Sequence, residues 1–200
     1  MKETYTMGDK RQETITKYLG DMKAAVHHVE QAMERQKDEL RDDPQVSQLC
    51  GLVALGLQRQ RADIDRELEG RGGSPTAPVK EGVAAVAGVL AGLYNKVRTE
   101  GPAKSLRDDH TALNWLYVSW TTLHTTAVAL GDSAVADLAK RSFGECARWS
   151  TQVDRLLPET VFRELSDGDL GRLDATAPQQ THAAAHAAWG GEVRGEVTSS

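Results

Sequence analysis

The chain has 200 residues, of which 40% are hydrophobic, 26% are charged and 5% are aromatic, and its formal net charge at pH 7 is -5. A chain of this length can bury a hydrophobic core without disulfides or metals, so we expect one domain. Lysine and arginine are spread along the sequence rather than clustered, and we therefore expect no nucleic acid partner.

The first two predicted elements are amphipathic helices joined by a short turn. From Glu13 to Leu40, apolar residues recur every three or four positions and charged residues occupy the opposite face. Asp43 is a suitable N-cap and Pro44 a suitable first residue for a second helix, which extends to about Glu69. Because the turn between them is short, the two helices are expected to pack as antiparallel neighbours.

The next segment differs in composition and predicts a connecting helix. Residues 79–97 are rich in Ala, Val and Gly and follow a helical pattern, which Gly101 and Pro102 end. We interpret this segment as a crossover helix that returns the chain to the other end of the bundle. Its longest uncharged run, residues 82–95, is shorter than the roughly 18 to 20 apolar residues that a membrane span requires, so no span is expected.

Two further bundle helices are predicted after the crossover. The third covers about Ser105 to Leu130 and the fourth Ala134 to Leu157, separated by a turn at residues 131–133. Pro158 is expected to end the fourth helix, because proline lacks the backbone N–H of a helix interior. Residues 159–165 then predict a short helix that closes one end of the bundle.

Both termini are predicted to lie outside the bundle. Residues 1–11 form a polar extension without the apolar stretch of a secretion signal, and residues 166–200 form an Ala/Gly-rich tail that we expect to be mobile. In that tail, His182 and His186 would share one face of a helix, with Trp189 close by. This is a weak motif for a metal or for docking to a protein partner.

Cys50 and Cys146 are the only cysteines, and each lies within an apolar helical pattern. They lack the spacing of a metal site or a redox motif, and we expect two buried thiols in a cytoplasmic protein.

Three short phrases carry a resemblance to a known family. They are Tyr18-Leu-Gly-Asp21 in the first helix, Leu68-Glu-Gly-Arg-Gly-Gly-Ser-Pro75 after the second, and Ala129-Leu-Gly131 between the third and fourth. Together with the helix order, they resemble the ferritin-like superfamily, closest to its small bacterial stress-associated branch. The resemblance covers residues 12–165 and implies an all-α, ferritin-like four-helix bundle with a long crossover that contains an extra helix.

The resemblance also implies where a metal centre would lie. In that superfamily, two helices each supply one Glu and two others each supply a Glu-x-x-His pair to a di-iron or di-manganese centre. The corresponding positions here are Val26, Gly56 with Gln60 or Arg59, Leu113 and Glu145, and the sequence contains no Glu-x-x-His. Because a dinuclear centre needs several carboxylates, the resemblance implies a fold whose usual chemistry is lost, and we expect no cofactor.

Glu145 stands in an otherwise apolar helix face and has two interpretations. A buried carboxylate has to be hydrogen-bonded, protonated or bound to a metal. The favoured interpretation is a hydrogen bond to Gln60, Tyr117 or His110. The alternative is a residual metal site, in which Glu145 with His110 or His124 holds iron or manganese in a degenerate metal-dependent oxidoreductase.

The large aromatic residues suggest a third hypothesis. Trp115, Tyr117, Trp120 and Trp149 gather on the third and fourth helices, where they fill the core or, with Gln60, line a pocket for a small apolar ligand. The sequence contains no Gly-rich phosphate loop, GxSxG or HExxH motif. The first hypothesis for function is therefore a non-catalytic binding or interaction module, with a homo-oligomer as one arrangement and a ligand sensor as an alternative.

Overall fold

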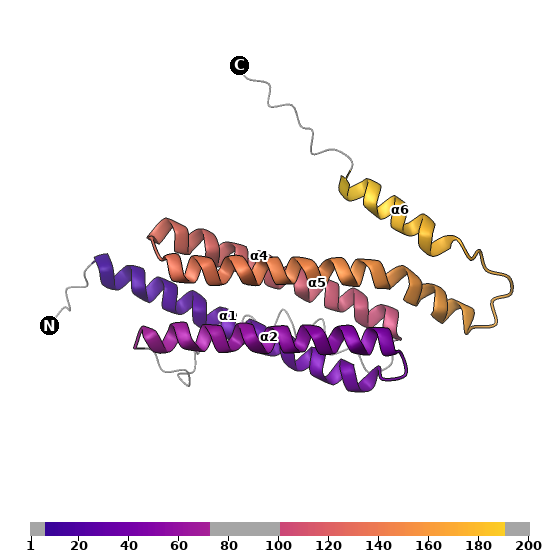
Figure 1. The fold of residues 1–200 in the computed structure, drawn as a ribbon, viewed down its shortest axis with the longest axis horizontal. Coiled ribbons are helices and arrows are strands. Elements are labelled where there is room, and N and C mark those ends of the chain that lie inside the picture. The colour runs from indigo at the N-terminus through magenta and orange to yellow at the C-terminus, as the bar shows by residue number, and fades with distance from the viewer. Residues whose placement is uncertain (1–6, 73–100, 191–200) are drawn as a thin grey trace, which may run out of the picture.

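The computed structural model describes residues 7–72 and 101–190, and every regular element within these ranges is a helix (Figure 1). The expected all-α class is therefore confirmed for the described part of the chain. The crossover helix expected at residues 79–97 lies outside the described residues. The helices are α1 (Met7–Glu39), α2 (Pro44–Gly70), α4 (Pro102–Leu130), α5 (Ser133–Ser166) and α6 (Ala177–Gly190).

Local signals set most helix ends where the sequence predicts them. The carboxylate of Asp43 accepts a hydrogen bond from the backbone N–H of Val46 at 3.3 Å, and Asp132 caps α5 in the same way through the N–H of Val135 at 3.2 Å. Gly131 ends α4 in the left-handed region, with φ 77°. The start of α1 differs, because Met7 and the residues after it are helical although residues 1–11 were expected to form an extension.

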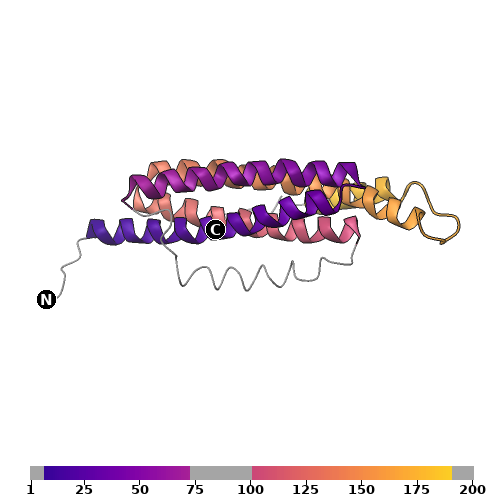
Figure 2. The same ribbon diagram turned by 90° about the horizontal axis from the view of Figure 1, so that it is seen from below.

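The four long helices form two antiparallel hairpins that lie against each other (Figures 1 and 2). One hairpin is α1 with α2 and the other is α4 with α5; between the hairpins, α1 packs on α4 and α2 packs on α5. At one end of the bundle, Arg71 at the end of α2 bonds to Asp132 at the start of α5. At the other end, Glu164 near the end of α5 accepts a hydrogen bond from the N–H of Ala103 at the start of α4. The chain therefore leaves α2 at one end and enters α4 at the opposite end.

The space between the hairpins is filled by apolar side chains. Val26 of α1 and Leu113 of α4, two of the positions aligned with metal ligands, are fully buried in this core. Gly56 of α2 allows the closest contact, because a Cβ atom there would lie 2.1 Å from the indole ring of Trp149. Trp149 can therefore reach the core only because residue 56 has no side chain.

The expected break at Pro158 does not occur, and α5 continues to Ser166. Proline in a helix interior costs about 3 kcal/mol, so tertiary contacts have to hold the segment that follows it. Arg163 supplies two of them, donating to the carboxylate of Asp43 at 2.7 Å and to Gln45 at 2.6 Å. Glu164 adds its bond to α4. The helix predicted separately at residues 159–165 is thus the last part of α5.

The tail predicted as mobile from residue 166 contains helix α6, which packs against α5. Thr176 precedes this helix, and its backbone carbonyl accepts a hydrogen bond from the N–H of Gln180 at 3.0 Å. Asp174 fixes Thr176 by accepting from both its N–H and its hydroxyl. Alanine, the residue with the highest helix propensity, dominates the sequence that follows, so a fixed start is enough to favour a helix.

None of the helices in residues 7–72 and 101–190 combines the length and the apolar character needed to cross a membrane.

Candidate functional site

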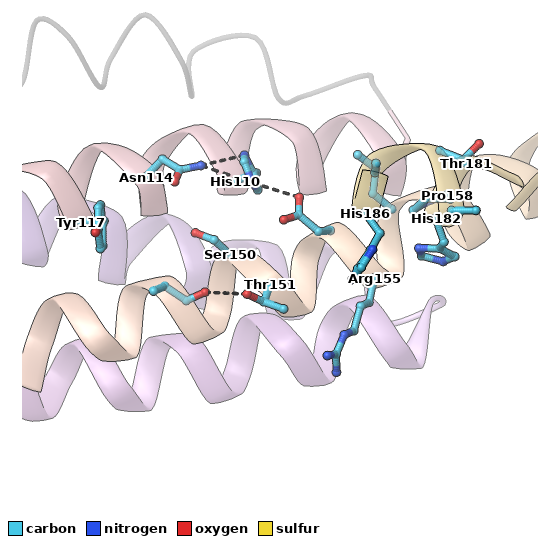
Figure 3. A pocket seen from close by; sticks show the side chains of 15 residues that line it. His110, Asn114, Tyr117, Ser150, Thr151, Arg155, Pro158, Thr181, His182 and His186 are labelled. Carbon is cyan, nitrogen blue, oxygen red and sulfur yellow. Dashed lines mark hydrogen bonds and ion pairs between the residues drawn. The ribbon is translucent and has the colours of Figure 1, made fainter. Parts of the chain in front are cut away.

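A groove of about 950 Å³ lies between α4, α5 and α6 (Figure 3). It exists because α6 packs back along α5 near the end of the bundle where α4 begins. Each helix presents one face to it, with side chains spaced three or four residues apart. The lining residues are His110, Asn114, Tyr117, Ala147, Ser150, Thr151, Asp154, Arg155, Leu157, Pro158, Thr181, His182, Ala183, Ala185 and His186.

His110 is held in one orientation on the α4 side of the groove. Its Nε2 lies 3.0 Å from Oδ1 of Asp154, and its Nδ1 lies 2.9 Å from the amide nitrogen of Asn114. That amide nitrogen also lies 3.2 Å from Nε2, but it can only donate, so Nδ1 is the acceptor and Nε2 carries the proton toward Asp154. This assignment follows from the hydrogen-bond network with the amide nitrogen of Asn114 turned toward the ring.

Ser150 lies on the α5 side of the groove and has a buried hydroxyl. The residue is only 7% exposed, and its hydroxyl makes no hydrogen bond with any described residue. Serine hydroxyls in helices commonly donate to the carbonyl four residues earlier, as Thr151 does here to Ala147 at 3.0 Å. A buried hydroxyl that makes no such bond costs about 1 to 3 kcal/mol. The hydroxyl oxygen of Ser150 is closed to solvent, so it is other atoms of this residue that line the groove.

The α6 side carries His182 and His186, which lie one helical turn apart. Nε2 of His182 is 4.0 Å from Oε1 of Glu159 on α5, at the limit of an ion pair and formed only when the imidazole is protonated. Apolar side chains separate these groups from the cluster around His110, because Leu157, Pro158 and the alanines of α5 and α6 also line the groove.

Glu145 lies away from this groove, in a separate buried cluster. Its carboxylate accepts a hydrogen bond from Nε2 of Gln60 at 2.9 Å, and Oε1 of Gln60 accepts from the indole N–H of Trp120 at 3.1 Å. We call Gln60, Trp120, Glu145 and Cys146 the Gln60 cluster. The hydrogen bond between Glu145 and Gln60 confirms the favoured interpretation of Glu145, and burial raises the pKa of the Cys146 thiol to about 12.

The three residues proposed as a metal site are not brought together. His110 bonds to Asp154, which lies nine positions after Glu145, about 13 Å along a helix. His124 contacts the ring of Phe143 edge to face, with ring centres 5.6 Å apart, and Phe143 is on a different side of α5 from Glu145. Within the described ranges, no three His, Cys, Asp or Glu side chains form a group that could hold a metal ion.

The five residues proposed to line a pocket have separate positions. Tyr117 lines the groove, whereas Gln60 and Trp120 are buried inside the bundle. Trp149 is buried against Gly56, and Trp115 packs on the edge of the core. Among these residues, only Tyr117 faces the groove.

A second buried polar cluster lies where α1, α2 and α4 meet. The thiol of Cys50 is 3.6 Å from Oε1 of Gln36 and 3.9 Å from Oδ2 of Asp109. We call Gln36, Cys50 and Asp109 the Gln36 cluster. Burial raises the pKa of Asp109 to about 8, Gln36 opposes this shift, and the neighbouring carboxylate of Asp108 adds to it. Burial also raises the pKa of Cys50 well above its usual range.

Sequence reasoning missed Asn114, Ser150 and Asp154, although each lies on a correctly predicted helix. Asn114 lies one helical turn after His110, and Asp154 lies one turn after Ser150. The sequence therefore already shows that each pair shares a helix face. Without α6, however, these faces would be exposed to solvent and would not line a groove.

Comparisons with protein-family models, with curated proteins and with solved structures find no match to this chain. The resemblance to the ferritin-like superfamily therefore stays a prediction.

Proposed function

We propose that this protein is a non-catalytic binding module that holds a small, largely apolar molecule in the groove between the bundle and α6. The observation that carries this proposal is the groove itself, a space of about 950 Å³ whose walls combine apolar side chains with the paired groups His110 and Asp154. This volume lies within the range of about 300 to 1,000 Å³ that is typical of small-molecule sites.

The composition of the groove supports binding rather than catalysis. Most of its apolar contact comes from short side chains such as those of Ala147 and Ala183 and from Leu157 and Pro158. Polar groups lie on both sides of the groove, with His110 and Asp154 on one side and His182 and His186 on α6. Both nitrogens of His110 are already engaged, so this imidazole is held as part of the wall and is not a free base.

The ferritin-like ancestry of the bundle is part of the same proposal. Two antiparallel hairpins, in which α2 ends at one end of the bundle and α4 begins at the other, support it, since ferritin-like folds have one long crossover. Apolar side chains at Val26 and Leu113 support the loss of the metal chemistry. In this interpretation, the groove beside α6 took over as the functional site.

Filling the groove tests the proposal. We would measure the binding of three probes that share one ring system, naphthylethylamine, naphthylethanol and naphthylacetate, by ligand-observed NMR and by fluorescence titration. Ala147→Trp places an indole in the groove and should weaken binding of the probes at least about tenfold, because it occupies the site. Ala62→Trp, at an exposed position on α2, is the matched control and should bind as the parent does.

Two results would contradict the proposal. One is that none of the three probes binds to the parent protein at millimolar concentration. The other is that Ala147→Trp binds them as tightly as the parent while circular dichroism shows an unchanged helical fold.

A further inference from the structure

We propose that the outer face of α4 is a docking surface for another segment of the same chain, residues 79–97. This face consists of the exposed residues Val118, Thr121, Thr122, Thr125, Val128 and Ala129, and we call it the outer α4 face. Residues 79–97 lie outside the described residues, so the proposal is drawn from the described helices and from the sequence. It concerns a different surface from the groove and does not depend on the binding function proposed for the groove.

The outer α4 face is exposed but uncharged. Residues 110–131 contain no Asp, Glu, Lys or Arg, although they make up about six turns of helix. The exposed face of α5, in contrast, carries charged residues such as Asp137 and Arg141. Because a helix face that meets water usually carries charged side chains, the outer α4 face is better suited to contact protein than solvent.

The polar groups of this face are already hydrogen-bonded within α4. The hydroxyls of Thr121, Thr122 and Thr125 donate to the backbone carbonyls four residues earlier, at distances of 2.9, 3.0 and 3.0 Å. Since each hydroxyl is engaged by its own helix, the methyl groups of these threonines remain as contact surface. Apolar side chains can therefore cover the face without leaving a hydroxyl donor unpaired.

The chain between α2 and α4 has to run from one end of α4 to the other. The end of α2 lies beside the end of α4, because Arg71 bonds to Asp132, two positions after the last residue of α4. At the opposite end of the bundle, Gly101 leads directly into the first residue of α4. Residues 73–100 therefore connect the two ends of α4, which has 29 residues and a length of about 44 Å.

Residues 79–97 have the length and the apolar face that suit this path. As a helix they would span about 28 Å, and the residues before and after them can cover the remaining distance. Valine and leucine recur every three or four positions, at Val79, Val83, Val86, Leu90, Leu93 and Val97. Residues 82–95 are uncharged, as is the outer α4 face, so neither surface would bury an unpaired charge of the other. The short connection at residues 98–101 favours antiparallel packing on α4.

The outer face of α2 is the alternative surface for this segment. It exposes Leu52 and Leu55, and α2 also runs between the two ends of the bundle. However, the half of α2 that lies next to residue 73 exposes Arg59 and Arg66. An uncharged segment on that face would remove water from guanidinium groups with which it cannot pair, so the outer α4 face is favoured.

Cysteine labelling of the full chain tests which face is covered. Val118→Cys and Leu55→Cys form a matched pair, since the two parent side chains are 59% and 56% exposed. We would follow the alkylation of each variant by N-ethylmaleimide with mass spectrometry, and Cys50 and Cys146 should react slowly because they are buried. We expect Val118→Cys to react at least about tenfold more slowly than Leu55→Cys, because residues 79–97 cover it.

A charge placed in the apolar pattern of the segment should remove this protection. Leu90→Asp should raise the labelling rate of Val118→Cys to about that of Leu55→Cys and leave the rate of Leu55→Cys unchanged. Asn95→Asp is the matched control, since residue 95 lies on the opposite side of the helical pattern from Leu90, and it should change neither rate. Circular dichroism would confirm that the helices of each variant are intact.

Three results would overturn the proposal and leave the binding function of the groove standing. The first is equal labelling of the two single-cysteine variants or slower labelling of Leu55→Cys, a comparison that needs no change in the segment. The second is protection of Val118→Cys that persists in a folded Leu90→Asp variant. The third is protection that increases with protein concentration, which would assign the outer α4 face to a second copy of the chain.

Discussion

Two buried clusters in this bundle contain the same three kinds of side chain, a glutamine, a cysteine and a carboxylic acid, yet they differ in how completely they are hydrogen-bonded. In the Gln60 cluster, the amide of Gln60 links the indole N–H of Trp120 to the carboxylate of Glu145. In the Gln36 cluster, the amide nitrogen of Gln36 and one oxygen of Asp109 have no hydrogen bond of normal geometry among the described residues.

The difference follows from where each acid lies. Glu145 is only partly buried, and Gln60 holds its carboxylate from the core side. Asp109 is 2% exposed, and its neighbours are a weak thiol donor, an amide and the carboxylate of Asp108. Burial therefore decides the charge of Asp109, whereas hydrogen bonding decides the position of Glu145. Three predictions use this contrast, in order of expected size.

The largest effect should come from the pH dependence of Asp109. Its pKa is raised from 3.8 to about 8 in the folded protein, so the folded state binds the proton more tightly than the unfolded state. The stability that this proton contributes is complete below pH 4 and is lost as the pH rises to 8, by at most about 5 kcal/mol. Asp109→Asn, which cannot ionise, should match the parent at pH 4 and exceed it at pH 9.

Urea unfolding of both proteins between pH 4 and pH 9 measures this difference. Glu145→Gln serves as the comparison. The difference in free energy of unfolding between this variant and the parent should not grow with pH as it does for Asp109→Asn. Parallel curves for the parent and Asp109→Asn would show that Asp109 ionises normally in the folded protein.

The second effect concerns the two glutamines. Gln60→Leu leaves the fully buried indole N–H of Trp120 without a partner and should reduce the free energy of unfolding by about 2 to 3 kcal/mol. Gln36→Leu removes an amide that accepts from the weak thiol donor of Cys50 and reaches Asp109 only with poor hydrogen-bond geometry, and it should cost about 1 kcal/mol or less. Thermal and urea unfolding at pH 7 compare the two, and equal losses would contradict the contrast between the clusters.

The smallest effect concerns the low reactivity that the two cysteine thiols share. Burial raises the pKa of both thiols, to about 12 for Cys146 and further for Cys50, so neither forms the reactive thiolate at neutral pH. Iodoacetamide should label both slowly in the folded protein and rapidly in urea, as read by mass spectrometry of the intact chain. Fast labelling of Cys50 alone in the folded protein would show that the Gln36 cluster opens to solvent.

The parts of the fold that could be predicted from the sequence are those fixed within a few turns of helix. The periodic apolar residues of α1, α2 and α4 predict those helices closely, and Asp43 and Gly131 mark their ends correctly. The hydrogen bond between Glu145 and Gln60 could also be anticipated, because a carboxylate on an apolar helix face needs a polar partner. The helix end predicted at Pro158 from local propensity was wrong, because contacts of Arg163 and Glu164 with other helices hold α5 together beyond it.

Most of the candidate site could not be predicted from the sequence, because it also depends on contacts between helices. His110 and Tyr117 were singled out, but Asp154, the partner of His110, lines a groove only because α6 packs beside it. The start of α6 is fixed by Asp174 and Thr176, a polar pair that reads in the sequence as part of an ordinary loop.

The sequence by itself determined that this chain is helical and which faces of its helices are apolar. These properties depend on spacing along one helix. Only the tertiary structure decided that Glu145 and His110 lie in different places, that Asp109 is enclosed by three helices, and that His110 and Asp154 meet in the wall of a groove. Such features depend on which helices meet, and the pattern of one helix does not specify its neighbours.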